Sequence, residues 1–397
     1  MSQRLNRMKS KVTYLLISAL ILTACTDKSY QGIESEMAAD EALPIHIVVG
    51  DPGDILESKG SGPVEDTDGA MWEGKTIHVF AFKRDLNSDY ANISATGHDD
   101  CLIDGSVDTE GALGGKEATV NTDDSYITWK NDDQTLYYRP GNQPYDFFAY
   151  YTDKPVPDSD IYRSKEGVRI MMDVDGSTDI MSAYAYLTEE QLNRPVFSDM
   201  DKVDLNTYAF SSWSAKRNIH PVLYFDHHLT RFDFEVKAGW EKSNDIIIDS
   251  LVVRSRRRAV FTVAHKNPSL LGLDFSNAPY EMTALSEADG SPLRKDFWKL
   301  HYIPGSEEMT KLGGSLMIAP DITYDAFLYL KQKMEDGEVK THENLISLVS
   351  SEGQFTAGSQ YLVSATIYGL TSIEISVKTT DWQEGGSIDV GSDKFEE

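Results

Sequence analysis

Residues 223–238 read Leu-Tyr-Phe-Asp-His-His-Leu-Thr-Arg-Phe-Asp-Phe-Glu-Val-Lys-Ala, and this stretch decides the fold class. From residue 231 onward, charged Arg, Asp, Glu and Lys alternate with apolar Phe, Phe, Val and Ala. A period of two predicts a β-strand with one face on a core and the other in water. Leu223 and Phe225 follow the opposite parity, so the pattern switches at His227-His228. We expect a bulge or bend there, where the chain enters a second β-domain.

Short β-prone runs separated by turn residues continue on both sides of this stretch. The predicted strands include residues 43–49, 77–82, 126–129, 136–138, 145–151, 246–253, 260–263, 297–303, 314–319, 327–331, 361–368 and 373–377. Asp336-Gly337 predicts a hairpin turn. Sustained helical periodicity is absent: only Thr188–Gln191 has capping-box spacing, and residues 194–214 are interpreted as a connection. The sequence therefore predicts a mainly β protein, with two sandwiches as the simplest arrangement.

Composition narrows the class of protein. The chain has 397 residues, which exceeds one ordinary domain, and 40% of them are hydrophobic, enough for real cores. The formal net charge is −27, and the pI near 4.6 argues against binding to nucleic acid, whose phosphates need a basic surface. We expect an extracytoplasmic surface protein, with no cofactor.

The N-terminus has the pattern of a lipoprotein signal peptide. A positive region precedes the apolar run Val12–Leu22, which is too short to span a bilayer permanently. Leu22-Thr23-Ala24-Cys25 resembles a lipobox. We therefore predict a signal peptide over 1–24, lipidation of Cys25, and a polar tether over 25–42. Because only Cys101 remains, the fold must hold without an intramolecular disulfide.

An early strand and an accessible loop follow the tether. Leu43–Val49 is strongly β-prone, and residues 50–71 are rich in Gly, Pro, Asp and Glu, as in a long exposed loop. Lys59-Gly60 offers a protease a basic residue in a flexible segment. The first strand is thus joined to the rest of the chain by a segment that a protease can reach. We place an N-terminal domain at 43–218 and a C-terminal domain at 219–397.

Candidate chemistry is sparse. Adjacent strand residues point to opposite faces, so His227 and His228 are interpreted as one half-buried and one exposed histidine, not as a metal site. Asp173–Asp179 has the glycine too early for a calcium loop and no Glu at the twelfth position, so it is interpreted as an acidic turn. Arg254–Arg258, the only basic cluster, could bind phosphates or an acidic subunit, although a solvated hairpin turn is the simpler interpretation. Neither a catalytic motif nor a metal-binding cysteine pair occurs in the sequence, so we expect no enzyme activity.

Several stretches together resemble the fimbrillin (type V pilin) family of Bacteroidales lipoproteins, including its fimbrillin-like (Mfa-like) branch. They run in order along the chain. They are Leu22–Cys25, Ile77–Phe82, Asp179–Ala183, Leu223–Val236, Gly313–Pro320, Phe355–Tyr361, and Ile373–Trp382 followed by Gly385-Gly386. Each is a strand with a turn, and their order and spacing carry the resemblance.

The resemblance implies two tandem transthyretin-like β-sandwiches that reach the outer membrane as a lipoprotein exported by the Sec route. It also implies that a protease removes the segment up to and including the first strand. A strand of a neighbouring subunit then fills the groove, which is donor-strand exchange. The removable strand maps to Leu43, Ile45, Ile47 and Val49, and the cleavage site to Lys59 and Gly60. Members processed by arginine-specific proteases carry Arg at that site, whereas this chain has no Arg between Arg7 and Arg84.

Two functions remain open. After Trp382 only Ile388, Val390 and Phe395 are sizeable apolar residues, which is thin for a donor strand, so we expect a tip, accessory or anchor subunit that supports adhesion. Other pilin subunits and a host or bacterial surface ligand would be its partners. The alternative is a glycan-binding outer-membrane lipoprotein, whose aromatic platforms would come from Tyr137, Tyr138, Tyr150, Tyr151 and Trp213. Core packing is the competing interpretation for those aromatics.

Overall fold

A computed structural model describes most of the chain between residues 42 and 380. The described ranges are 42–50, 72, 74–85, 90–91, 93, 101–105, 113–121, 126–130, 135–193 and 197–380. The predicted lipidation site Cys25 and cleavage site Lys59-Gly60 lie outside them. Within these ranges, no helix is both long and apolar enough to span a membrane.

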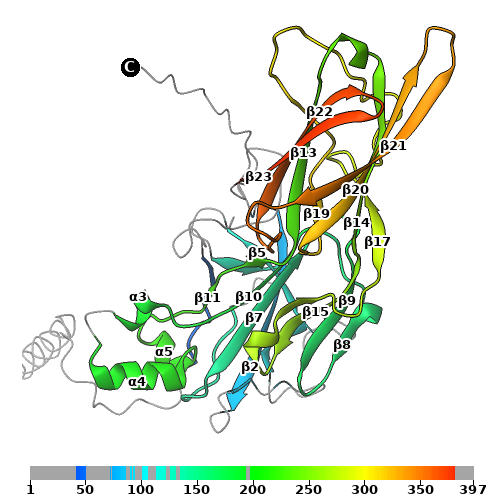
Figure 1. Cartoon of the computed structure of the whole chain (residues 1–397). Helices are drawn as coiled ribbons and strands as arrows, with labels where there is room; N and C mark the ends of the chain where they lie inside the picture. Colours follow the sequence, from blue (N-terminus) through cyan, green and yellow to red (C-terminus); the bar gives the residue numbers. More distant parts are fainter. Residues whose placement is uncertain are drawn as a thin grey trace, which may run out of the picture. The chain divides into compact units, whose positions relative to one another are not determined.

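The structure is mainly β, as predicted, and two of its sheets enclose the first core (Figure 1). One is eight-stranded, in the order β12 (Asp226–His227), β10 (Ile180–Tyr184), β7 (Tyr145–Thr152), β2 (Thr76–Asp85), β5 (Lys116–Val120) and β6 (Ile127–Trp129), with β3 (Tyr90–Ala91) and β4 (Cys101–Ile103) also on β2. The other is β16 (Gly272–Asp274), β15 (Arg258–His265), β9 (Gly167–Asp173) and β8 (Ile161–Arg163). Phe80, Phe148 and Tyr150 from the first sheet share a core with Ile170 and Phe261 from the second. Tyr145–Tyr151 is buried on both faces, which confirms the predicted central strand.

A second pair of sheets encloses the second core. One sheet, which we call the β13 sheet, is β18 (Thr310–Lys311), β13 (Thr230–Ala238), β22 (Gln360–Gly369) and β23 (Ser372–Thr380), with β19 (Leu316–Ile318) also on β13. The facing sheet is β17 (Tyr280–Ala284), β14 (Ile246–Arg256), β20 (Thr323–Lys333) and β21 (Val339–Val349). Phe232 lies at the centre of this core, with Tyr324, Phe355 and Tyr361 around its ring. The hairpin predicted at Asp336-Gly337 joins β20 to β21 and projects at the upper right of Figure 1.

Several sheets combine strands from both sides of residue 218. β9 pairs with β15, β10 with β12, and β1 (Val48–Val49) with β11 (Val222–Leu223). The chain therefore returns to the earlier strands after it has entered β13. The division into domains at 218 stays a prediction.

The stretch 223–238 breaks where its parity switches. β12 ends at His227 in the eight-stranded sheet, and β13 begins at Thr230 in a different sheet. Phe232, Phe234 and Val236 are buried, as the pattern predicts. The opposite face differs from the prediction, because Arg231 and Asp233 are only 4% and 7% exposed. The carboxylate of Asp233 accepts hydrogen bonds from Ser315 at 2.6 Å and Gln360 at 2.5 Å, which satisfy it away from water.

Two helices occupy the segment that the sequence presented as a connection. α4 (Asp199–Tyr208) begins with a capping box between Ser198 and Asp201, and α5 (Ser212–Ala215) with one between Ser211 and Ser214. The prediction of an irregular connection is wrong because it relied on the absence of helical hydrophobic periodicity. These short helices are instead stabilised at their N-termini by capping boxes. The turn predicted at Thr188–Gln191 is confirmed as α3 (Glu189–Leu192), with its capping box. There are also short 3-10 turns, η2 (Asp158–Asp160), η3 (Glu241–Ser243) and η4 (Pro268–Leu270).

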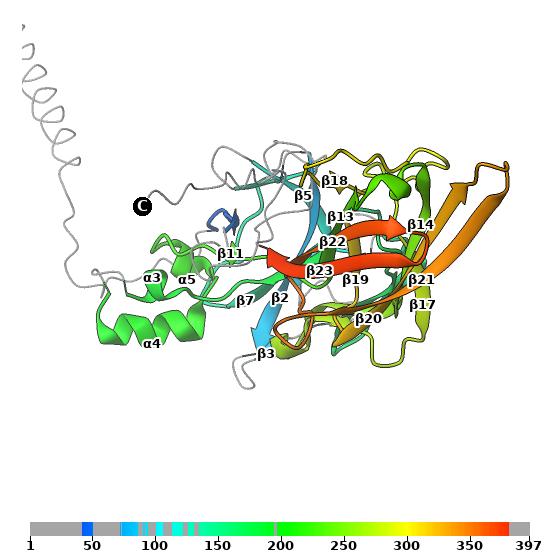
Figure 2. The ribbon, with the colours of Figure 1, turned by 45° about the horizontal axis from the view of Figure 1, so that its top comes forward.

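Two further predictions are wrong. Residues 297–303 form only an isolated bridge, between Ile247 and Lys299. The arginine-rich segment is not a hairpin turn, because β14 runs to Arg256, β15 starts at Arg258, and the two strands lie in different sheets. In Figure 2, β22 and β23 cross the front of this part of the molecule, and the β20–β21 hairpin extends to the right.

Candidate functional site: the slot of the first strand

Residues 43–50 lie extended between two segments from elsewhere in the chain. On one side, the Ile45 amide donates to the Leu136 carbonyl at 2.8 Å, and Tyr138 donates to Leu43 at 2.8 Å. Further along, the Ile127 amide donates to the carbonyl of Ile47 at 3.1 Å. Antiparallel bridges connect Pro44 with Tyr137 and Val48 with Tyr126. Of the strand predicted at Leu43–Val49, only Val48–Val49 form a regular strand, β1, and Pro44 forms an isolated bridge. That a protease removes this segment stays a prediction.

The other side of the segment is held by β11. The Val48 amide donates to the Pro221 carbonyl at 3.1 Å, and the Gly50 amide donates to the Leu223 carbonyl at 3.0 Å. The register is parallel, with Val48 beside Val222. Both edges of the segment are therefore hydrogen-bonded by non-local chain. We call this seat, bounded by residues 126–127, 136–138 and 221–223, the strand slot.

Alternate side chains of the segment point inward. Ile45, Ile47 and Val49 are 6%, 1% and 5% exposed, whereas His46 is exposed and Leu43 half-buried. Complete burial of one aliphatic side chain is worth about 1.5–3 kcal/mol, so the three inward residues supply most of the attachment. The His46 ring contacts the rings of Tyr126 and His220 edge-on, at 5.9 and 5.4 Å. Backbone pairing with alternate pocket-filling side chains is the geometry of strand addition to a sheet edge.

Gly50 closes the slot. A Cβ added at this residue would overlap the ring of Tyr224, so any larger residue here requires that ring to move. On the far side of residues 51–71, Trp72 is buried against Phe225 and Tyr151, with ring centroids 4.9 and 5.8 Å apart. The chain is thus anchored on both sides of the predicted cleavage site.

Buried aromatics flank the slot. Tyr138, whose amide binds Leu43, is 1% exposed, and its ring lies 6.2 Å from Phe147, which in turn meets Phe210 edge-on. Burial raises the pKa of the Tyr138 hydroxyl, because the phenolate would be desolvated. This hydroxyl makes no hydrogen bond within the described ranges. Of the five aromatics proposed as a glycan platform, only Tyr137 is exposed, at 52%; Tyr138, Tyr150, Tyr151 and Trp213 pack inside.

The candidate metal ligands contact other groups. His227 lies against Asp179, Nδ1 to Oδ2 2.8 Å, and both side chains are fully buried. His228 bonds instead to Ser182, Nε2 to Oγ 2.6 Å, and packs on Phe261. The prediction of one half-buried and one exposed histidine is wrong, because His227 is buried and His228 is half-buried. The two side chains nevertheless contact different groups. Within the described residues, no group of three or more His, Cys, Asp or Glu side chains could hold a metal ion.

Each arginine of the basic cluster faces an acid. Two of the pairs are close, Arg256 with Asp321 at 3.1 Å and Arg257 with Asp173 at 2.9 Å. The other two, Arg254 with Asp325 and Arg258 with Glu281, are 3.9 Å apart. Because these charges are matched within the chain, the cluster offers a partner little net charge. The acidic residues of Asp173–Asp179 do not converge on one site. Asp175 pairs with Lys154 at 2.5 Å, whereas Asp179 is buried against His227.

The inserted segment is visible in the sequence, but the residues that hold it are not. Ile45, Ile47 and Val49 are recognisable because they alternate. The seat is built from Leu136, Tyr138, Pro221 and Leu223, which are brought together by the tertiary fold and share no local pattern. The dipeptide Val-Gly at 49–50 is the one local signal for where the strand ends.

These features agree with a family assignment from sequence. The profile of the family described as fimbrillin-like matches residues 67–382, which is most of the chain. The chain therefore belongs to the fimbrillin-like family, as the resemblance predicted. No curated protein sequence matches this chain.

Two solved structures from Bacteroides are among those that align with most of this chain. A candidate cell adhesion protein from Bacteroides uniformis has a TM-score of 0.43 and 15% identity, over 86% of this chain and 99% of that one. A fimbrial protein from Bacteroides vulgatus has a TM-score of 0.43 and 16% identity, over 86% of this chain and 100% of that one. The family assignment rests on the sequence profile.

Proposed function

We propose that this chain is a non-catalytic pilus subunit of the cell surface that assembles by donor-strand exchange at the strand slot. The observation that carries the proposal is the seating of residues 43–50. They are bonded on both edges and inserted through three alternate side chains, yet joined to the body only through residues 51–71. Cleavage at Lys59-Gly60 would leave this segment held by non-covalent contacts alone.

The anchoring of Trp72 supports the same proposal. Because Trp72 is packed on Phe225 and Tyr151, the body retains its own contacts after the cut. The vacated slot would present unpaired backbone at Leu136, Pro221 and Leu223, together with three apolar pockets. An unpaired sheet edge with such pockets accepts a strand from another chain. The donor would come from a neighbouring pilin subunit.

We place the subunit at the tip of the pilus, among accessory subunits, or at its anchor. The segment between Arg7 and Arg84 holds no arginine, so release of the first strand would need a protease that cuts at another residue, such as Lys59. Cys25 would carry the lipid that delivers the precursor to the outer membrane after Sec export.

N-terminal sequencing with intact mass of the protein taken from the cell surface tests the proposal. A mature start between Gly50 and Met71 supports exchange at this slot. A diacylated Cys25 on every molecule contradicts exchange at this slot and leaves only the placement at the anchor. Lys59→Ala should preserve the precursor mass if Lys59 is the cleaved residue, whereas Lys165→Ala, a matched lysine change in the body, should leave processing unchanged.

A further inference from the structure

The β13 sheet has a second, outward face, and a cavity lies on it. The cavity has a volume of about 500 Å³, within the range of roughly 300–1,000 Å³ typical of small-molecule sites. Its floor is formed by β13, β22 and β23, and its wall by residues 302–309. It is separate from the strand slot, and no function considered above uses it.

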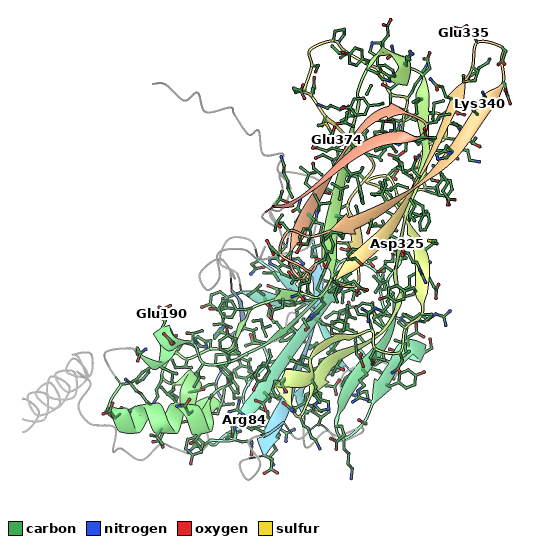
Figure 3. All side chains as sticks on the ribbon, in the orientation of Figure 1. Arg84, Glu190, Asp325, Glu335, Lys340 and Glu374 are labelled. Atoms are coloured by element: carbon green, nitrogen blue, oxygen red, sulfur yellow. The ribbon has the colours of Figure 1, made fainter. Side chains whose placement is uncertain are left out.

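The floor of the cavity is a grid of polar side chains. Strand register places Glu235, Ser364 and Ser376 in one cross-strand row. Lys237, Thr366 and Glu374 form the next row. Hydroxyl groups thus occupy both β22 positions, and charged groups occupy three of the four positions on β13 and β23. Figure 3 shows Glu374 projecting from β23 on the side away from β20 and β21.

The carboxylates of the grid are oriented and retain acceptor capacity. Glu235 is half-buried and accepts one hydrogen bond, from Ser364 at 2.5 Å. Glu374 accepts one from the Tyr368 hydroxyl at 3.1 Å. An ionised carboxylate has about four acceptor positions, so each can accept further hydroxyl donors. Carboxylates held in this way can bind the paired hydroxyls of a ligand.

Aromatic side chains complete the lining. Tyr302 from the loop and Tyr368 from β22 both face the cavity. The Tyr368 position is fixed from behind, because the Trp240 indole N–H donates to its carbonyl and a Cβ at Gly239 would overlap its ring. A fixed aromatic ring offers an apolar face beside polar groups, with little loss of entropy on binding.

The charge of the lining selects among polar ligands. Three carboxylates, Glu235, Glu307 and Glu374, stand against two amines, Lys237 and Lys378. Lys237 is already paired with Glu307. The excess of negative charge disfavours phosphates and acidic sugars, and the net charge of −27 on the whole chain adds to that repulsion.

We propose that this cavity binds a neutral saccharide, about one or two hexose or N-acetylhexosamine units in size. Sugar hydroxyls would bond to Glu235, Thr366 and Glu374, and the C–H face of a ring would lie on Tyr368. The proposal goes beyond the pilus role, because it assigns the subunit a ligand at a surface that strand exchange does not use. A failure of saccharide binding would therefore leave the strand-slot proposal intact.

Saturation-transfer NMR and an array of neutral disaccharides test the proposal on the purified mature chain. We expect binding of at least one neutral disaccharide, such as lactose, N-acetyllactosamine, chitobiose or mannobiose, and no binding of sialyllactose. Glu374→Gln should weaken binding about tenfold, as expected for one charged hydrogen bond. Thr366→Trp, which fills the cavity, should abolish it.

The chain offers a matched control. Glu343 on β21 faces the Tyr329 hydroxyl as Glu374 faces that of Tyr368, but lies outside the cavity. Glu343→Gln should leave affinity within about twofold, since surface changes away from a site are close to neutral. The proposal is overturned if no neutral saccharide binds, if Thr366→Trp binds as well as the parent, or if only a cationic peptide such as oligolysine occupies the cavity.

Discussion

Val48 lies beside Val222 in parallel register, and its amide donates to the carbonyl of Pro221 at 3.1 Å. The first strand is therefore paired with β11, which lies far along the chain. Every strand of the eight-stranded sheet except β12 comes between the two in the sequence. Because the paired residues are far apart in the sequence, no turn or short loop holds the two strands together. The pairing is stabilised by side-chain burial and by backbone hydrogen bonds.

Ile47 should be the residue that most strongly retains the first strand. Its side chain is 1% exposed. Ile47→Asp removes an aliphatic contact, and the new carboxylate cannot stay buried there, so the first strand would be displaced from the slot. We expect a loss of about 3 kcal/mol or more in the free energy of unfolding. Thermal and urea unfolding measure the change. His46→Asp, at the exposed neighbour, should change stability by no more than about 0.5 kcal/mol. Equal effects of the two variants would show that the strand is not seated through its inward face.

Gly50 should tolerate no side chain while Tyr224 is present. A Cβ at residue 50 would overlap the Tyr224 ring, so Gly50→Ala forces a displacement and should cost about 1–3 kcal/mol. The double variant with Tyr224→Ala should recover most of the loss caused by Gly50→Ala in a double-mutant cycle. Additive effects in that cycle would contradict the proposed overlap.

His78 should make the fold weaken in acid. Burial lowers its pKa to about 4, because the charged imidazolium would be desolvated beside the stacked Tyr150 ring. The unfolded chain, with a pKa near 6.5, takes up the proton first as the pH falls. The stability contribution is thus complete above about pH 6.5 and is lost as the pH falls toward 4, by up to about 3 kcal/mol.

Comparison with His78→Gln measures this contribution. Urea unfolding between pH 7 and pH 4 should show a shallower pH dependence in the variant than in the parent. Parallel curves for the two proteins would show that His78 does not contribute to the acid sensitivity.

The ion pair of Asp104 and Arg163 should matter more than those of the basic cluster. Two guanidinium nitrogens donate to Asp104, at 2.9 and 2.5 Å, and the side chains are only 1% and 5% exposed. Asp104→Ala leaves a buried cation unpaired and should cost about 3–5 kcal/mol in unfolding free energy. Glu281→Ala, which removes the exposed partner of Arg258, should cost less than about 0.5 kcal/mol. A similar cost for both would contradict the role of burial.

Periodicity could predict the fold class, and tertiary context accounts for what it missed. Alternation identified β13 and β23, and the parity switch at His227-His228 located the transfer between sheets. Arg231 and Asp233 look like a solvated face in the sequence. In the structure Ser315 and Gln360 donate hydrogen bonds to the Asp233 carboxylate, which in turn lies 3.5 Å from the Arg231 guanidinium. Local alternation contains no information about such distant partners.

The two sites differ in how far the sequence could reveal them. Ile45, Ile47 and Val49 can be predicted to lie in a strand, because an isolated β-prone run before a long loop is evident from the sequence alone. The saccharide cavity was not, because its rows join β13 to β22 in parallel and β22 to β23 in antiparallel register. Its residues appear in the sequence as ordinary polar positions of three unrelated strands.

The central claim is that the strand slot can exchange its occupant. Its direct test is a variant in which residues 59–62 are replaced by a specific protease site, cut after folding. A labelled peptide of residues 42–50 is then added, and its binding is followed by fluorescence anisotropy. The account predicts that the cut protein releases its own segment and binds this peptide, but not a peptide in which Ile45 and Ile47 are replaced by Asp. Failure of the folded, cut protein to bind the peptide after losing its segment, or equal binding of both peptides, would contradict it.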